Sequence, residues 1–160
     1  MKRFRPNVCA VVADDQESKV LVFRRVDQVL GENRWQFPQG GLDNGELPEQ
    51  GLLRELKEEI GTDDVQIIRK APQTISYEFP QAILEALQQS APEKTGFDGQ
   101  EQHWFLVRLN QGDTAIHFDH QPQEFDAFRW VTPQEALALV VDFKRSAYLE
   151  GLSMLGLVEK

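Results

Sequence analysis

Cysteine is nearly absent from this sequence, since Cys9 is the only one. A single cysteine excludes an internal disulfide and favours a reducing compartment, so we expect a cytoplasmic protein. The sequence also lacks any apolar run long enough to span a membrane, and its first residues lead into no signal-peptide core. We therefore expect no membrane association.

Positive charge is also scarce. The chain has 17 Lys and Arg against 26 Asp and Glu, which gives a net charge of -9. A field of this sign repels a long polyanion and argues against broad, nonspecific nucleic-acid binding. It allows a short phosphorylated ligand held in a local basic pocket, and divalent cations bound among carboxylates would cancel part of the excess.

Repeats, low-complexity tracts and linkers are absent as well, so we expect residues 1–160 to form a single domain. Hydrophobic residues make up 41% and charged residues 27%, a composition typical of globular proteins rather than disordered chains. A monomer is the expected state.

Apolar and turn-forming segments predict a mixture of strands and helices. Residues 7–13 and 19–25 are expected to pair as a hairpin across an acidic turn. Further strands are expected at 65–70, 74–79, 103–109 and 125–131, and helices at 47–60, 80–89, from Thr132, and 143–155. Because strands and helices do not alternate strictly, we predict an α+β fold with a mixed β-sheet sandwiched between α-helices.

The helix predicted for residues 47–60 has an unusual distribution of charge. Its apolar residues fall on one stripe at helical spacing, which directs that face into the core. Glu55, Glu58 and Glu59 project from an arc of roughly 100° beside the stripe. Grouped carboxylates next to a Gly-rich turn suit Mg²⁺, although acidic runs on helices are more often solvated faces. Gly51 lies within the same arc and leaves room for a ligand or a loop to approach.

This segment resembles the Nudix pattern G-x5-E-x7-R-E-U-x-E-E-x-G-U, in which U is a bulky aliphatic residue. The residues in register are Gly40, Glu46, Arg54, Glu55, Leu56, Glu58, Glu59 and Gly61. A chance match at the seven polar or Gly positions is expected on the order of once in 10⁸ windows. Only Thr62 departs from the pattern, at a packing position after the helix. The chain is thus identified as a member of the Nudix hydrolase family.

Segments outside this pattern resemble one branch of the family, which contains bacterial RNA pyrophosphohydrolases and plant- and bacterial-type diadenosine polyphosphate hydrolases. They are Phe4-Arg5-Pro6-Asn7-Val8, Trp35-Gln36-Phe37-Pro38-Gln39-Gly40-Gly41, Gly99-Gln100-Glu101-Gln102-His103-Trp104-Phe105, Glu124-Phe125-Asp126 with Trp130-Val131, and Phe143-Lys144-Arg145 with Tyr148. The resemblance implies the Nudix fold with its catalytic loop-helix-loop.

The same resemblance implies a set of roles. Mg²⁺, for which Mn²⁺ can substitute, would be held by Glu55, Glu58 and Glu59 with the Gly40 carbonyl. Glu124 would supply a further ligand or the carboxylate that activates water. Arg54 would hold a catalytic glutamate in position, so the catalytic residues implied are Arg54, Glu55, Glu58 and Glu124.

Substrate-binding residues are also implied by this branch. The cationic positions that match phosphate contacts are Arg5, Arg24, Arg25 and Lys144, although a lone arginine is usually a solvated surface charge. Tyr77 matches an aromatic residue near the phosphates or base, and Phe125 would stack on a base. Both aromatic side chains have core positions as the alternative.

Substrate choice depends on two departures from the relatives. Glu101 and His103 stand where relatives often carry Lys, and residues 27–33 form a longer, more acidic loop than the RNA-processing relatives usually show. With the net charge, these features favour a dinucleoside polyphosphate of the diadenosine tetraphosphate type. The alternative is an RNA 5′ pyrophosphohydrolase. A non-catalytic nucleotide sensor ranks last because the four glutamates implied in catalysis and metal binding are all present.

Overall fold

The computed structural model describes residues 1–27, 34–90 and 96–159, and it has the α+β architecture predicted from the sequence. The helices are α1 (Pro48–Ile60), α2 (Gln81–Ser90), α3 (Pro133–Leu139) and α4 (Asp142–Met154), with a 3-10 turn η2 at Asp113–Ala115. The strands are β1 (Phe4–Val12), β2 (Val20–Arg25), β3 (Trp35–Gln36), β4 (Gln39–Gly41), β5 (Val65–Lys70), β6 (Ile75–Glu78), β7 (Gly99–Leu109) and β8 (Phe125–Val131).

The described strands form two sheets. The larger sheet is mixed: its order is β4-β1-β7-β5, with β6 also paired to β7. Its central pair, β1 and β7, is parallel, and its other pairs are antiparallel. The smaller sheet has the antiparallel order β3-β2-β8. The predicted mixed sheet is therefore present, with a second, smaller sheet beside it.

The central strands carry apolar side chains on both faces. In β1, Cys9 and Val11 join one buried cluster, while Val8 and Ala10 join another. Because successive strand side chains point to opposite faces, this division follows from the sequence alternation itself. It explains the continuous apolar runs at residues 8–12 of β1, 20–23 of β2 and 104–107 of β7, a pattern typical of strands covered on both sides.

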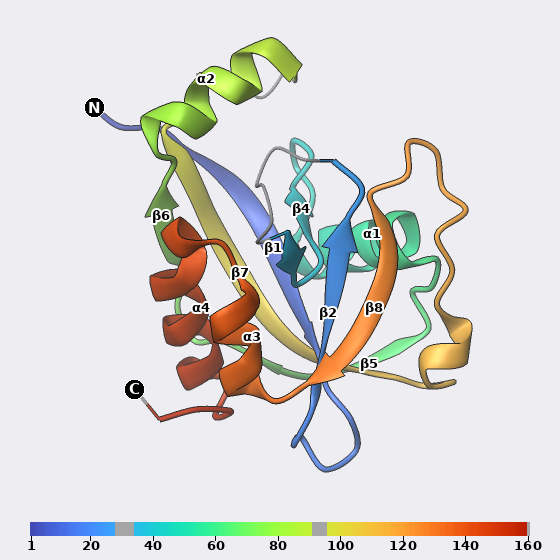
Figure 1. The fold of residues 1–160 in the computed structure, drawn as a ribbon. Helices are drawn as coiled ribbons and strands as arrows, with labels where there is room; N and C mark the ends of the chain where they lie inside the picture. Colours follow the sequence, from blue (N-terminus) through green and yellow to red (C-terminus); the bar gives the residue numbers. More distant parts are fainter. Residues whose placement is uncertain (28–33, 91–95, 160) are drawn as a thin grey trace.

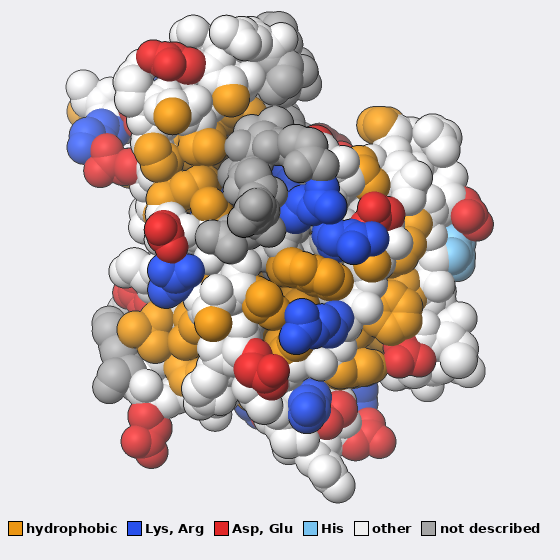
Figure 2. Space-filling model, viewed as in Figure 1, with side chains coloured by type: hydrophobic (Ala, Val, Ile, Leu, Met, Phe, Trp, Pro, Cys, Tyr) orange, Lys and Arg blue, Asp and Glu red, His pale blue; other side chains and the backbone are white. Residues whose placement is uncertain are grey.

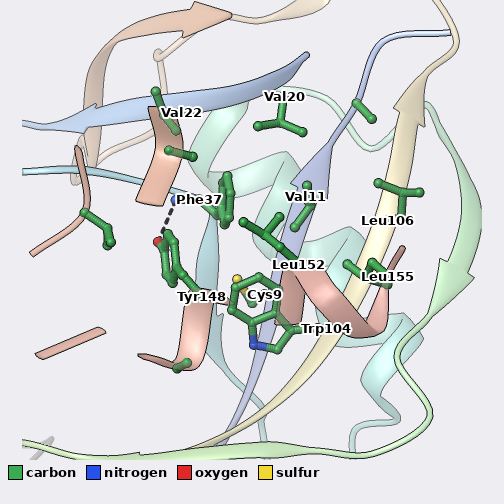
Figure 3. Close-up of a cluster of buried hydrophobic side chains, with 14 of the residues drawn as sticks. Cys9, Val11, Val20, Val22, Phe37, Trp104, Leu106, Tyr148, Leu152 and Leu155 are labelled. Atoms are coloured by element: carbon green, nitrogen blue, oxygen red, sulfur yellow. Dashed lines mark hydrogen bonds between the residues drawn. The ribbon is translucent and has the colours of Figure 1, made fainter. Parts of the chain in front are cut away.

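Helices cover the two faces from opposite sides (Figure 1). The α3–α4 side contributes Ala136, Ala147 and Leu152 to one cluster, and α1 contributes to the other. In the first cluster Phe37 stacks on Tyr148 with ring centroids 4.6 Å apart, and the backbone N–H of Phe37 donates to the Tyr148 hydroxyl at 2.9 Å (Figure 3). These contacts tie α4 to the segment between β3 and β4. No helix in the described part of the chain is long and apolar enough to cross a membrane.

The predicted hairpin between residues 7–13 and 19–25 is confirmed at its turn and is wrong beyond it. The turn is closed by the antiparallel bridge of Ala13 with Val20 and by the hydrogen bond from the Asp14 N–H to the Lys19 carbonyl at 3.1 Å. Within the described residues, β1 and β2 themselves belong to different sheets. The reason is that β4 and β7 occupy the two edges of β1, while β3 and β8 occupy those of β2. The other predicted strands and helices are confirmed to within a few residues, and residues 28–33 of the acidic loop lie outside the described residues.

Candidate active site

Helix α1 positions the acidic residues. Leu52, Leu56 and Ile60 are fully buried and fix the orientation of the helix against the sheet. The helix ends at Gly61, whose φ of 84° is left-handed and readily adopted by glycine, as predicted. With the apolar stripe held in this way, Glu59 is 7% exposed at the border of the core.

The glycine-rich loop before α1 approaches the helix closely. A Cβ built on Gly40 would lie 2.0 Å from Cδ of Glu55, so only glycine lets the Glu55 carboxylate occupy this place. A Cβ built on Gly51 would lie 2.2 Å from a methyl carbon of Leu42, which shows that a loop fills the room left at Gly51. Both glycines therefore let the loop and α1 pack with these side chains in their present positions.

Arg54 joins the loop to the acidic side chains. It donates to both carboxylate oxygens of Glu46, each at 2.8 Å, and to the Gly41 carbonyl at 2.8 Å. Its remaining terminal nitrogen donates to Glu55 at 2.8 Å and to Glu58 at 3.4 Å. This arrangement is the one expected for an arginine that holds a glutamate by charge-assisted bonds, with Glu46 as an additional anchor.

Charge repulsion and burial dominate the electrostatics of this region. Burial raises the pKa of Glu59 well above its ordinary value, and the negative charges of Glu55 and Glu124 raise it further. Burial likewise raises the pKa of Glu55, against the lowering effect of its hydrogen bond from Arg54. By contrast, the bonds from Arg54 lower the pKa of Glu46 to about 2. The cleft thus carries negative charge in excess beside the Arg54 anchor.

Two adjoining cavities surround these groups. The acidic cleft, of about 690 Å³ and open to solvent, is lined by the predicted metal-binding residues Gly40, Glu55, Glu58, Glu59 and Glu124, together with Arg5, Asn7, Arg25, Gln36, Gln39, Gly41 and Gln100. The basic pocket, of about 600 Å³, is lined by Arg5, Arg25, Gln39, Tyr77, Phe79, Ile83, Leu87, Phe97, Gln100, Phe143 and Lys144. Since the two cavities share several residues, they form one continuous site.

The acidic cleft suits a hard cation in its donor types. Its donors are carboxylate and carbonyl oxygens, which Mg²⁺ prefers. The pKa of Glu59 is raised first by burial and then by the negative charges of Glu55 and Glu124, which a divalent ion would offset. Within residues 1–27, 34–90 and 96–159, no three His, Cys, Asp or Glu side chains converge closely enough to hold a metal ion. Glu55 and Glu58 are instead turned toward Arg54.

Three of the predicted cations meet in the basic pocket. Arg5 and Arg25 line both cavities, and a Cβ on Gly41 would lie 2.2 Å from a terminal nitrogen of Arg5. Lys144 is only 4% exposed, and burial and the charge of Arg25 lower its pKa to about 7. The structure thus brings together residues from the first strand and the last helix.

Arg24 and Phe125 do not line this site. Arg24 points to the other face of β2, where it pairs with Asp126 at 2.7 Å and lies over Trp35. Figure 2 shows Lys and Arg side chains lying among hydrophobic ones near the centre of the face in view. Phe125 is 1% exposed and packs on Phe23 with ring centroids 5.3 Å apart. It is therefore a core residue, and the prediction that it stacks on a base is wrong.

Tyr77 lines the basic pocket as predicted, but Glu101 and His103 do not. Tyr77 donates to Gln100 at 3.0 Å. Because side chains alternate along β7, Gln100 faces the cavities while Glu101 and His103 face the other side of the sheet. The predicted weakening of the positive field by these two residues is therefore not seen at the site.

Sequence reasoning missed a group of amide side chains in the cleft. Asn7, Gln39 and Gln100 line it, and Gln102 donates to Asn7 at 2.9 Å and to Gln39 at 2.7 Å. The alternation of Gln100 and Gln102 along one strand was the available signal, because buried amides require partners. Glu46 was recognised only as part of the pattern, without its role as the anchor of Arg54.

The fold and the site define a hydrolase of phosphoanhydride bonds, with carboxylates on one wall and cations on the other. A family model described as "NUDIX domain" matches residues 3–150, which is most of the chain. The chain therefore belongs to the Nudix family.

Curated relatives similar to the chain include proteins named RNA pyrophosphohydrolase. The one from Campylobacter jejuni subsp. jejuni serotype O:2 is 41% identical over 151 residues, covering 92% of this chain and 90% of the relative. Those from Nitratiruptor sp. and Helicobacter pylori strain P12 are 40% and 39% identical, each covering 92% of this chain and 90% of the relative.

Solved structures show the same fold at lower identity. The Escherichia coli dihydroneopterin triphosphate pyrophosphohydrolase matches with a TM-score of 0.65 and 22% identity, covering 93% of this chain and 97% of that one. A Caenorhabditis elegans Ap4A hydrolase binary complex matches with a TM-score of 0.61 and 15% identity, covering 94% and 96%. These likenesses confirm the fold.

Proposed function

We propose that this enzyme removes pyrophosphate from triphosphorylated RNA 5′ ends, as the names of its curated relatives suggest. The observation that carries the proposal is the single continuous site in which the glutamates of α1 face Arg5 and Arg25. A 5′ triphosphate is short, so it needs cations at only one end of the RNA. The site supplies these cations despite the net charge of -9.

A dinucleoside polyphosphate is the second candidate substrate. It is supported by the net charge of -9, which disfavours a long polyanion. The replacement of lysines of the relatives by Glu101 and His103 supports this substrate less than the sequence indicated, because these two side chains face away from both cavities. The relatives at 38–41% identity are named RNA pyrophosphohydrolases, which favours the RNA 5′ end over the dinucleotide.

The acidic cleft is proposed to bind Mg²⁺ or Mn²⁺ through Glu55, Glu58 and Glu59, the Gly40 carbonyl and Glu124. When bound, the metal supplies positive charge to phosphate oxygens and lowers the pKa of a water. Glu124 lies beside the cleft because its carbonyl accepts the N–H of Val26 at 3.0 Å, which fixes the loop before β8.

The other side chains are proposed to bind and orient the substrate. Arg5, Arg25 and Lys144 hold phosphate oxygens, and Tyr77 lines the basic pocket together with the apolar residues Ile83 and Leu87 of α2. Arg54 holds Glu55 in position, so that the carboxylate does not turn away when substrate approaches. Such positioning and electrostatic stabilisation supply most of the rate in phosphoryl chemistry. We further propose a cytoplasmic location, because the one cysteine, Cys9, is free and buried. The monomeric state favoured from the sequence stays a prediction.

The test is a side-by-side kinetic comparison with Mg²⁺. One substrate is a short RNA carrying a 5′ triphosphate, the other is diadenosine tetraphosphate, and products are resolved by chromatography. We expect pyrophosphate and a 5′-monophosphorylated RNA, with the higher kcat/KM on RNA. A preference of tenfold or more for diadenosine tetraphosphate would contradict the RNA assignment and establish the second candidate. Turnover of neither substrate, with nucleotide binding retained, would instead indicate a sensor.

A further inference from the structure

A hydrogen-bonded row of buried amides runs beneath the site. Gln102 and Asn7 are each 1% exposed, and Gln100 is 9% exposed. The amide N–H₂ of Gln102 donates to Gln39 at 2.7 Å and to Asn7 at 2.9 Å, and because it has only two hydrogens, its longer contact of 3.3 Å with Gln100 shares one of them. These side chains come from β1, β4 and β7, so the row crosses the sheet at the place where the acidic cleft and the basic pocket meet.

The direction of these hydrogen bonds is fixed by Trp104. An indole N–H only donates, and that of Trp104 donates to Oε1 of Gln102 at 3.1 Å. The amide nitrogen of Gln102 must then face the other way, where it donates to Oε1 of Gln39 at 2.7 Å. Reversal of either amide would place two acceptors or two donors against each other in a buried environment, which is costly.

The consequence reaches the cavities at Gln39, which lines both of them. Since its carbonyl oxygen accepts the hydrogen bond from Gln102, its N–H₂ group is directed away from Gln102. The backbone N–H of Gln39 donates to Glu59 at 3.2 Å, so the residue is anchored at the main chain as well. With the backbone of Gln39 fixed in this way, the orientation of its side-chain amide depends on Gln102.

We propose that Gln102, held by Trp104, is a positioning residue that makes Gln39 present N–H donors, rather than its carbonyl oxygen, to the phosphate groups of the substrate. A carbonyl oxygen in this place would repel an anionic phosphate, whereas an N–H group binds it. The inference rests on the proposed function, because it requires a phosphorylated substrate in the cleft.

The test replaces Gln102 by leucine, which has a similar size but neither donates nor accepts. With Gln39 released, we expect KM for triphosphorylated RNA to rise about tenfold, which corresponds to one weakened bond to a charged group, while kcat falls less than threefold. The dissociation constant of inorganic pyrophosphate, measured by calorimetry at constant Mg²⁺, should rise by a similar factor. Gln102→Glu keeps an acceptor for Trp104 but loses the donors to Gln39. It should raise KM and the dissociation constant of pyrophosphate as Gln102→Leu does.

Thr132→Ala is the matched control. Thr132 accepts the N–H of Glu135 at 3.1 Å at the start of α3, and it lines neither cavity. The Thr132→Ala variant should have a lower Tm but unchanged KM for RNA and unchanged affinity for pyrophosphate. If both Gln102 variants bind pyrophosphate and RNA as the control does, Gln102 is only structural and the inference is wrong. A wild-type enzyme that does not act on RNA would contradict the proposed substrate, but the pyrophosphate comparison would still decide the role of Gln102.

Discussion

The bond between Glu46 and Arg54 offers a quantitative test of how the catalytic loop is held. Glu46 accepts two bonds of 2.8 Å from Arg54, and its carboxylate also accepts the N–H of Asp43 at 3.0 Å. The perturbation is Glu46→Gln, which keeps the shape of the side chain and removes its charge. Charge-assisted bonds contribute about 1.5–3 kcal/mol each, and the amide retains one acceptor, so a loss of about 2 kcal/mol is expected at pH 7.

The pKa of Glu46 gives a second estimate of the same quantity. Its lowering from 4.5 to about 2 corresponds to at most about 3.5 kcal/mol, at about 1.4 kcal/mol per unit. Solvent screening reduces this figure, because the Arg54 side chain is 28% exposed and that of Glu46 is 14% exposed. For a chain of this size, about 2 kcal/mol lowers Tm by about 4–8 °C.

The pH dependence fixes the sign of the effect. Because the folded pKa lies below the ordinary one, the stabilisation is fully present above pH 4.5 and is lost as the pH falls toward 2. The difference in Tm between wild type and Glu46→Gln should therefore be full at pH 7 and shrink between pH 4.5 and 3. The control is Glu49→Gln, since Glu49 lies in the first turn of α1 at 3.8 Å from Lys70 and is 54% exposed, and should change Tm by less than about 2 °C. A Tm difference that does not change between pH 7 and pH 3 would refute the reasoning.

Glu58→Gln should lower kcat by about 10²-fold or more with an unchanged circular dichroism spectrum, whereas Glu85→Gln on α2 should retain full activity. Near-normal turnover at saturating Mg²⁺ would exclude Glu58 from catalysis. Millimolar Mg²⁺ should raise Tm relative to EDTA at matched ionic strength, because a cation relieves repulsion around Glu59, and an unchanged Tm would count against a preformed metal site. Lys144→Met should stabilise the fold below pH 7, where the wild-type protein must bury a charged lysine. Burial lowers the pKa of Lys144 from 10.5 to about 7, so the destabilisation that this charge causes decreases as the pH rises between these values. Urea unfolding at pH 6 and 9 should show a gain at pH 6 that shrinks at pH 9, while KM for RNA rises, and an equal gain at both would contradict the lowered pKa.

Local sequence determined the catalytic helix almost completely. The apolar stripe, the glutamates beside it and Gly61 are all within one segment, and helical periodicity relates them without any long-range information. The strands β8 and β5 were likewise predicted from local residue patterns, with the bounds they have in the structure. The role of Arg54 was implied by the family resemblance, and the structure shows it donating to Glu55 and Glu58.

Tertiary structure decided which of the remaining residues reach the site. Arg24 and Arg25 are neighbours in sequence, but strand alternation sends only Arg25 into the cavities, and the choice depends on which face of β2 is covered. Phe125 lies in the core because α1 covers that face. Local periodicity contains no information about such coverage.

The pairing of strands shows the same limit. β1 and β2 carry buried apolar side chains on both faces, a pattern that predicts burial but does not specify a partner. The short turn between them therefore suggested a hairpin, but the strands pair only at that turn. The parallel pairing of β1 with β7 joins residues about a hundred positions apart, and it creates the row of amides around Gln102. The sequence by itself determined the arrangement of Glu55, Glu58 and Glu59 on the acidic wall of the site, because these three residues share one helix, whereas Glu124 joins them only through the fold. Only the folded sheet determined the cationic and amide wall, because its residues come from strands and a helix that meet through long-range packing.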